Sequence, residues 1–366
     1  MMTAQELLAL AHDEGMVTDC DLSGLDLSGL DLAEIMFTSV TFHNTLFGSA
    51  CLDRAIFEKC DFTGAVFTDT AFIGTHFRKC SGTAPDFSGS DMDTTHLDAC
   101  IWPEANFSHA VMFSAIIRKC ELNGANMQGL RTDKSVIMES SLLQADLRHA
   151  NMDRMAFIKV ALKDARLQPC KYSRTVFQEC DLSGQDLSGA SLSTVNFSNC
   201  KMPGVNLAGA TLENSLFMKS VLTDASLRKV RADGSNWQGA VLIKADMEQG
   251  EFKNALFIEA DLSLAHCAGA DFYGSIFAKS TCMATDMSAC RLCYCDFSYA
   301  RLRQTDFSAS NCLGMRMHSV EESGVKWNGA NRLLMRGTDE ELARAEKWAA
   351  PEAARARSLD EKTSDS

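Results

Sequence analysis

Residues 180–199 read Cys-Asp-Leu-Ser-Gly-Gln-Asp-Leu-Ser-Gly-Ala-Ser-Leu-Ser-Thr-Val-Asn-Phe-Ser-Asn, and this stretch decides the fold. A large apolar residue stands at every fifth position, with a smaller residue two places before it. A period of five matches neither the 3.6 residues of an α-helix turn nor the two-residue alternation of a strand. The chain must therefore turn after each short extended piece. Gly184 and Gly189, two places after a central leucine, suit the positive φ of such a turn.

The same register continues in both directions along the chain. Counting in fives from Leu22 to Trp327 gives about 62 pentads without an insertion. A longer period of 20 residues is carried by cysteines, namely Cys20, Cys60, Cys80, Cys100, Cys120, Cys180 and Cys200. Four pentads therefore make one coil, with sides centred on Leu182 (first), Leu187 (second), Leu192 (third) and Phe197 (fourth). We expect the central and the small residues to point inward and residues 20 apart to stack, giving a rod of roughly 70 Å.

Several pentads share the order small residue, Asp or Asn, large apolar residue. Clear examples are Ala125-Asn126-Met127, Ala145-Asp146-Leu147, Ala260-Asp261-Leu262 and Ala270-Asp271-Phe272. The chain thus resembles the pentapeptide-repeat family, whose motif is Ala-(Asp/Asn)-Leu-x-x, over about 85% of its length. The resemblance implies an all-β fold, a right-handed quadrilateral β-helix. Such repeat proteins lengthen on one core, so 366 residues do not imply several globular domains.

Both ends of a solenoid expose its core and unpaired strand edges, so both need cover. Thr3 and Glu6 form a capping box that opens a predicted helix over residues 3–14, and Thr338 and Glu341 form a second one. We expect each helix to plug one end. The predicted parts are an N-terminal capping helix (1–19), the pentapeptide-repeat β-helix (20–332), and a C-terminal capping helix with a disordered tail (333–366).

The sequence contains no nucleophile paired with a base, no glycine-rich phosphate loop and no insertion that would build a pocket. We therefore expect no enzymatic activity and no cofactor. No stretch approaches the roughly 18 apolar residues of a membrane span. The N-terminus carries Glu6, Asp13 and Glu14 in place of the basic region of a signal peptide. We predict a cytoplasmic protein without membrane or nucleic-acid partners, and leave export by a non-Sec route open.

The 15 cysteines follow the repeat period, and we interpret them as reduced core residues. Cys290, Cys293 and Cys295 look like a ligand cluster, but in this register Cys293 points outward while the other two point inward. His76 and His96 should stack on the outside, and two histidines on a flat face form a poor zinc site. We therefore expect no metal site.

An outer column of the second side is mostly acidic. We expect its members to hydrogen-bond to the turns: Asp26, Asp86, Asp146, Asp186, Asp246, Asp286 and Asp306, mixed with Asn106, Asn126 and Asn206. The family resemblance also implies an alternative function, mimicry of DNA toward a type II topoisomerase. The repeats carry 36 acids and 29 bases, about half a negative charge per coil. Duplex DNA carries about two per 3.4 Å. The projecting loops of the quinolone-protection relatives are also missing.

The fourth side differs from the other three in its outer residues. Apolar residues flank the central one there, and they form what we call the apolar stripe: Ile56, Ile116, Val136, Met138, Ile158, Val176, Leu216, Met218, Leu256, Ile258 and Ile276. A lysine column edges it: Lys59, Lys79, Lys119, Lys159, Lys219 and Lys279. This side alone has a positive balance, with six acids and nine bases. A contiguous exposed apolar patch usually marks a partner surface.

We therefore predict a non-enzymatic scaffold or adaptor that binds a protein partner, or a second copy of itself, through the fourth side. Coils that begin Cys-Asp-Leu-Ser-Gly resemble pentapeptide proteins associated with type VI secretion, which implies a bacterial secretion-system accessory factor. A translocated effector of type III secretion is a further alternative. The sequence does not identify the partner, the oligomeric state or the pathway.

Overall fold

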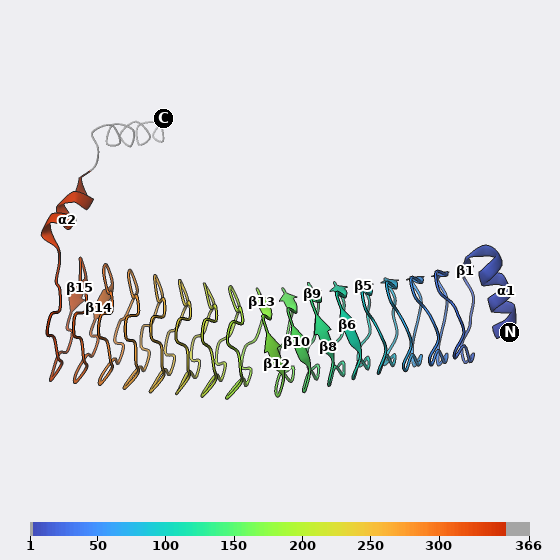
Figure 1. Ribbon diagram of the computed structural model, residues 1–366, viewed down its shortest axis with the longest axis horizontal. Coiled ribbons are helices and arrows are strands. Elements are labelled where there is room, and N and C mark those ends of the chain that lie inside the picture. The colour runs from blue at the N-terminus through green and yellow to red at the C-terminus, as the bar shows by residue number, and fades with distance from the viewer. Residues whose placement is uncertain (1–2, 349–366) are drawn as a thin grey trace.

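The computed structural model describes residues 3–348 as an elongated four-sided coil with a helix at each end (Figure 1). Backbone pairing is parallel and joins residues 20 apart, for example Phe37 to Phe57 and Phe57 to Phe77. This confirms the predicted β-helix and its stacking register. The pairing starts at Met16 and ends at Arg336, so the coil is four residues longer at each end than the expected 20–332.

Three of the four sides contain three-residue strands, and elsewhere the coils meet through single parallel bridges. The fourth side holds the nine-stranded sheet β1(Met16–Thr18), β2(Met36–Thr38), β3(Ile56–Glu58), β4(His76–Arg78), β5(His96–Asp98), β7(Ile116–Arg118), β9(Val136–Met138), β11(Ala156–Ile158) and β13(Val176–Gln178). The third side holds β6(Val111–Phe113), β8(Arg131–Asp133), β10(Asn151–Asp153) and β12(Lys171–Ser173). The first side holds β14(Arg301–Arg303) and β15(Glu321–Ser323).

The inward and outward positions are those that the period predicts. In most pentads the central residue and the one two places before it are buried, whereas the other three are usually partly or fully exposed. The residue two places after the centre has positive φ, +68° at Gly184 and +65° at Gly189. Other residue types adopt the same turn, such as Lys59 at +55° and Asn199 at +59°. The stacked coils therefore impose this backbone conformation even where glycine does not favour it.

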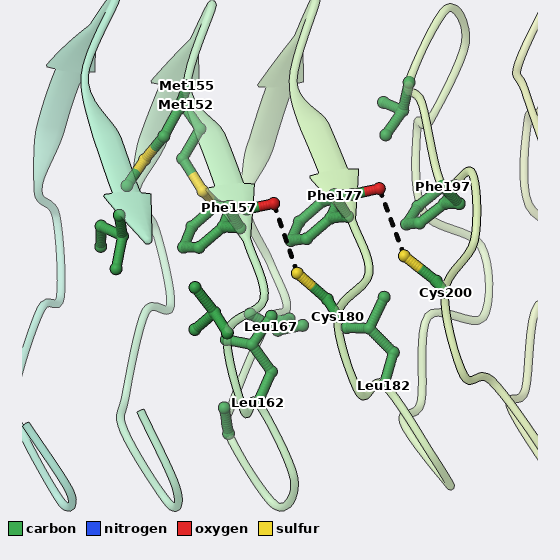
Figure 2. Close-up of a cluster of buried hydrophobic side chains, with 14 of the residues drawn as sticks. Met152, Met155, Phe157, Leu162, Leu167, Phe177, Cys180, Leu182, Phe197 and Cys200 are labelled. Carbon is green, nitrogen blue, oxygen red and sulfur yellow. Dashed lines mark hydrogen bonds between the residues drawn. The ribbon is translucent and has the colours of Figure 1, made fainter. Parts of the chain in front are cut away.

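Aromatic rings stack inside the fourth side and form a ladder along the rod (Figure 2). Ring centroids lie 4.9 Å apart between Phe157 and Phe177, 5.2 Å between Phe177 and Phe197, and 5.1 Å between Phe197 and Phe217. Trp237 continues the ladder 4.1 Å beyond Phe217. These rings are fully or almost fully buried, and they pack directly behind the strands that carry the outer residues of this side.

The small inward residues tie neighbouring coils together. The Cys180 thiol donates to the carbonyl oxygen of Phe157, with Sγ and O 3.3 Å apart (Figure 2). Two coils further on, in the same column, the Ser220 hydroxyl donates to the carbonyl oxygen of Phe197 at 2.5 Å. Thiol and hydroxyl thus serve the same purpose, which confirms that the cysteine column belongs to the core.

Helix α1(Ala4–Glu14) covers the N-terminal end of the coil. Its capping box is present: the Glu6 carboxylate accepts from the Thr3 amide at 2.7 Å, and the Thr3 hydroxyl accepts from the Glu6 amide at 3.3 Å. Leu7 is fully buried, and Leu8 packs against the same core. The predicted N-terminal cap is therefore confirmed.

Helix α2(Glu340–Lys347) is present at the other end, but it does not plug the coil. Its N-cap is Asp339, one residue after the predicted Thr338, and the Asp339 carboxylate accepts from the Glu341 and Leu342 amides. The helix lies against the outer surface of the fourth side, where Glu346 bonds to Tyr299 and His318. The expected plug is wrong because these outward polar side chains hold α2 on the flank.

The backbone ladder is interrupted once, near Pro169. In the described chain, no backbone hydrogen bond joins residues 165–174 to residues 184–195 of the next coil. Pro169 occupies the turn position, where its equivalents His149 and Gly189 both have φ of +65°. Proline fixes φ near −65° and lacks an N–H, so it fits neither the turn nor the ladder. The Gln168 side-chain amide partly replaces the lost bonds, donating to the Asp186 and Ser188 carbonyl oxygens at 3.2 Å.

Candidate protein-binding face

The structure places every residue of the apolar stripe on the outer surface of the fourth side. None of them belongs to the core cluster. Ile56 and Ile116 are exposed, at 37% and 36%, and the other stripe residues are half-buried. The inward and outward assignment of the fourth side is therefore as predicted, whereas its role in binding stays a prediction.

Backbone pairing makes the stripe continuous over part of the rod. Ile116, Val136, Ala156 and Val176 are direct neighbours on strands β7, β9, β11 and β13. Met138 and Ile158 are neighbours in the second outer column of the same strands. Further along, Leu256 pairs with Ile276. The first outer column is thus apolar without interruption from Ile116 to Val176 and again from Leu256 to Ile276, whereas Leu216 stands alone between Asn196 and Asn236.

Exposed apolar residues also occur on other sides of the rod. Ile101 on the first side is 49% exposed, more than any residue of the stripe. Its neighbours in the column are Ser81 and Glu121, however, so it is isolated among polar residues. Single exposed apolar side chains are normal on protein surfaces. What distinguishes the fourth side is the vertical continuity of its apolar columns.

Over part of its length the lysine column alternates with glutamates. Glutamates on adjacent coils lie within 4 Å of three lysines: Lys119 with Glu139 at 3.9 Å, Lys159 with Glu179 at 3.7 Å, and Lys279 with Glu259 at 3.8 Å. Exposed pairs of this kind contribute about 0–1 kcal/mol each. These glutamates stand at multiples of 20 residues from the lysines, in the same column, but the sequence alone does not show that the side chains meet.

The described C-terminal helix already occupies part of the fourth side. The Tyr299 hydroxyl donates to one oxygen of the Glu346 carboxylate, and His318 Nε2 lies 3.3 Å from the other. The Asp339 amide donates to His318 Nδ1 at 3.1 Å, which leaves Nε2 to carry the proton in the neutral ring. Helix α2 buries His318, which is 3% exposed. A hollow of about 350 Å³ between helix and coil is lined by Ala278, Ser298, Tyr299, Arg316 and Leu342, among others.

Two histidines interrupt the stripe between Ile56 and Ile116. The rings of His76 and His96 stack edge to face with centroids 4.5 Å apart, as predicted. Burial, and then the neighbouring imidazole, lower the pKa of His96. The nearby Asp98 carboxylate is bound by Arg118 at 2.9 Å. Within residues 3–348 no group of three potential ligands is arranged to hold a metal ion.

Most of the thiols are core residues, whereas Cys51 and Cys293 lie outside the core cluster. Burial raises the pKa of Cys282 and of Cys290 to about 12, so both are protonated at neutral pH. Cys290 and Cys295 point inward, as predicted, and Cys293 lies outside the core cluster. Cys293 is nevertheless only 4% exposed, and its Sγ lies 3.6 Å from the Asn311 carbonyl oxygen.

The aspartate column of the second side bonds to the turns, as expected. The Asp26 carboxylate accepts from the Ser28 amide at 3.0 Å, and Asn106 does the same for Ser108 at 3.1 Å. Several of these carboxylates also have basic partners, such as Asp146 with Arg148 at 2.7 Å. The column therefore presents less free negative charge than its sequence implied.

No helix within the described residues is both long and apolar enough to cross a membrane.

No protein of curated function matches the sequence. Solved structures resemble it only distantly. HetL, a pentapeptide repeat protein involved in heterocyst differentiation regulation in the cyanobacterium Nostoc sp. strain PCC 7120, is 18% identical with a TM-score of 0.35, over 68% of this chain and 97% of HetL. The plasmid-mediated fluoroquinolone resistance protein QnrB1 is 20% identical with a TM-score of 0.25, over 54% and 82%.

Two family models match the sequence directly. The model described as pentapeptide repeats (8 copies) matches residues 18–58, 60–98, 90–129, 220–257 and 285–320. The model described as a pentapeptide repeat region matches residues 150–237. Together these matches span well over half of the chain. The chain therefore belongs to the pentapeptide repeat family.

Proposed function

We propose that the protein is a non-enzymatic scaffold that binds a partner protein through the apolar stripe of the fourth side. The observation that carries the proposal is the vertical continuity of apolar residues on an outer surface, from Ile116 through Val136 and Ala156 to Val176. These side chains contribute little to the core, which lies on the other face of the same strands. Continuous apolar surface of this kind typically belongs to an interface.

The aromatic ladder beneath the stripe supports the proposal. Phe157 and Phe177 are buried behind the strands that display Ile158 and Val176. Close packing under a surface keeps its residues in place, which lowers the entropy that binding must remove. A role in a bacterial secretion system stays a prediction that rests on the resemblance of the Cys-Asp-Leu-Ser-Gly coils alone.

Site-specific photo-crosslinking in the native cell tests the proposal. A photoreactive phenylalanine analogue is placed singly at Ile158 or Leu216 on the fourth side, and at Ile101 or Val221 on the first side. All four side chains are outward and apolar, so the two pairs are matched. We expect a discrete cross-linked product from the fourth-side positions only. Equal products from both sides, or none from Ile158 and Leu216, would rule out the fourth side as the interface.

A further inference from the structure

Helix α2 shows how the fourth side holds a helix. Of its acidic residues, Glu346 contacts the coil, through the hydroxyl of Tyr299 and the imidazole of His318. Leu342 lines the hollow beside Ala278 and Ser298. Ala343 is 9% exposed. The acidic side chain of the helix thus bonds to a hydroxyl and an imidazole of the coil. Small and apolar residues of the helix lie close to the coil surface beside this contact.

The residues that receive α2 stand in the same columns as the apolar stripe. Tyr299 lies 20 residues after Lys279, in the lysine column. Ala278, Ser298 and His318 follow Ile258 in the second outer column, which also contains Ile158 and Met218. The surface under α2 is therefore a continuation of the stripe, and Glu346 bonds where the lysine column passes.

The spacing of the stripe suits a helix that lies along the rod. Stacked coils repeat at roughly 4.8 Å. Apolar residues three and four places apart on one face of a helix are separated by about 4.5–6.0 Å along its axis. One helical turn thus meets one coil. An extended strand in the same direction presents a side chain about every 6.6–6.8 Å and loses this match after a few coils.

The charge beside the stripe favours an acidic helix. Between Ile116 and Lys279 the outer columns of the fourth side carry five bases and three acids, although the whole chain has a net charge of −13. The three acids lie next to Lys119, Lys159 and Lys279. Lys219 stands in its column between Asn199 and Gly239, both uncharged. A carboxylate on a bound helix therefore finds a cation at Lys219 without competing with a neighbouring acid.

We propose that the fourth side binds an amphipathic α-helix of a partner protein, with leucine-like residues on the stripe and acidic residues over the lysine column. This inference rests on the proposed function, because it names the kind of segment that the same face receives. Helix α2 occupies the last part of this surface. The sites for the partner helix are the continuous block from Ile116 to Val176 and the stretch from Leu216 to Ile276, which Asn236 interrupts.

Two synthetic 18-residue peptides test the inference with the full-length protein. They share one leucine face and differ in the polar face, which carries glutamates in one peptide and lysines in the other, with helicity matched by circular dichroism. Binding is followed by fluorescence anisotropy. We expect the glutamate peptide to bind at least tenfold more tightly than the lysine peptide. The acidic net charge of the protein acts against this result, so non-specific attraction cannot produce it.

Variants locate the binding. Ile158→Ser with Leu216→Ser should weaken binding of the glutamate peptide at least tenfold, and Lys219→Glu should weaken it about fivefold or more. Ile101→Ser with Val221→Ser, on the first side, should leave it unchanged. Two results would overturn the inference. One is equal or tighter binding of the lysine peptide, and the other is an affinity of the glutamate peptide that the stripe variants leave unchanged. If photo-crosslinking at Ile158 succeeds while neither peptide binds, the helix inference fails and the proposed function stands.

Discussion

The thiol of Cys200 donates a hydrogen bond to the backbone carbonyl oxygen of Phe177, which precedes it by 23 residues and lies one coil away, with Sγ and O 3.2 Å apart (Figure 2). The same relationship joins Cys60 to Phe37 and Cys80 to Phe57. Most cysteines of this column thus fill a core position and donate to a backbone carbonyl of the preceding coil, whereas Cys120 donates to the Arg118 carbonyl oxygen of its own coil. This relationship accounts for the cysteine spacing without any metal or redox role.

The first prediction concerns thiol reactivity. Burial raises the pKa of most core thiols, to about 12 for Cys282, whereas hydrogen bonding to neighbouring thiols lowers the pKa of Cys60 and of Cys180. The coil encloses all of these thiols, so they should be unreactive toward a thiolate-specific reagent at pH 8. Only Cys20, Cys51 and Cys170 are partly exposed among the 15 cysteines. Titration with Ellman's reagent should therefore detect at most three thiols in the native protein and 15 after unfolding. Rapid reaction of many more thiols without unfolding would contradict the core assignment.

The second prediction concerns the interrupted ladder. Pro169→Gly restores a residue that can adopt positive φ and donate its amide, so the ladder between residues 165–174 and 184–195 should close. The regained hydrogen bonds contribute about 1 kcal/mol each, and the greater freedom of glycine in the unfolded chain offsets about 1 kcal/mol. We expect a melting temperature a few degrees higher and slower amide exchange at Tyr172 and Asp186.

Pro203→Gly is the matched control, because Pro203 lies one place after a central residue and its carbonyl accepts normally from Gly184 at 2.9 Å. This change should lower stability slightly. If Pro169→Gly behaves like Pro203→Gly and amide exchange stays fast at Tyr172, proline is not the cause of the interruption.

The third prediction concerns acid. Hydrogen bonds from the hydroxyl and amide of Ser28 lower the pKa of Asp26, and those of Ser308 do the same for Asp306. A carboxyl whose pKa is lower in the folded state stabilises the fold above its unfolded pKa of about 4, and this contribution disappears as pH falls through the folded pKa. The melting temperature should be nearly constant from pH 7 to 5 and fall below about pH 4. Asp26→Asn with Asp306→Asn should reduce the fall, since Asn106 makes the same turn contact without a charge. An equally steep fall in this variant would contradict the explanation.

The fourth prediction concerns DNA mimicry. Basic groups pair with carboxylates of the second side, as Arg228 does with Asp246 at 2.9 Å and Lys326 with Asp306 at 3.2 Å. The free negative charge is therefore far from that of a duplex. We expect no inhibition of gyrase supercoiling at about 10 μM protein in low salt, where screening is weakest. Inhibition that fades as salt is added would favour the topoisomerase alternative over a scaffold.

Most of the fold was predictable because its period is local and repeats many times. The five-residue spacing around Leu182 and the 20-residue spacing of Cys180 and Cys200 determine which side chains face inward, and each further coil supports the same register. Two departures were not predicted. Pro169 stands at a turn position in the sequence, but a single exception among about 62 pentads does not indicate that the backbone ladder is interrupted there. The flank position of α2 depends on Tyr299 and His318, whose contacts with Glu346 span 47 and 28 residues and follow no repeat.

The candidate site was predictable only in part. The sequence places Ile158 and Leu216 outside, because period five leaves them no inward position. It does not show that Lys159 pairs with Glu179, since that contact depends on how long side chains lie across stacked coils. It also does not show that a helix of the same chain already uses the end of the face.

The outer apolar stripe should serve binding, whereas the aromatic ladder inside the fourth side should stabilise the fold. The most direct measurement compares three variants by thermal unfolding and by the affinity for the partner identified through cross-linking. Phe217 stacks between Phe197 and Trp237, at 5.1 and 4.1 Å, so Phe217→Ala should cost about 3–5 kcal/mol.

Ile158→Ser with Leu216→Ser should change stability by less than about 1 kcal/mol and reduce partner binding by about 2 kcal/mol or more. The first-side control, Ile101→Ser with Val221→Ser, should change neither by a comparable amount. The expected result is a stable double variant of the stripe that no longer binds its partner. A stripe variant that unfolds like Phe217→Ala, or one that is stable and still binds its partner at full affinity, would contradict it.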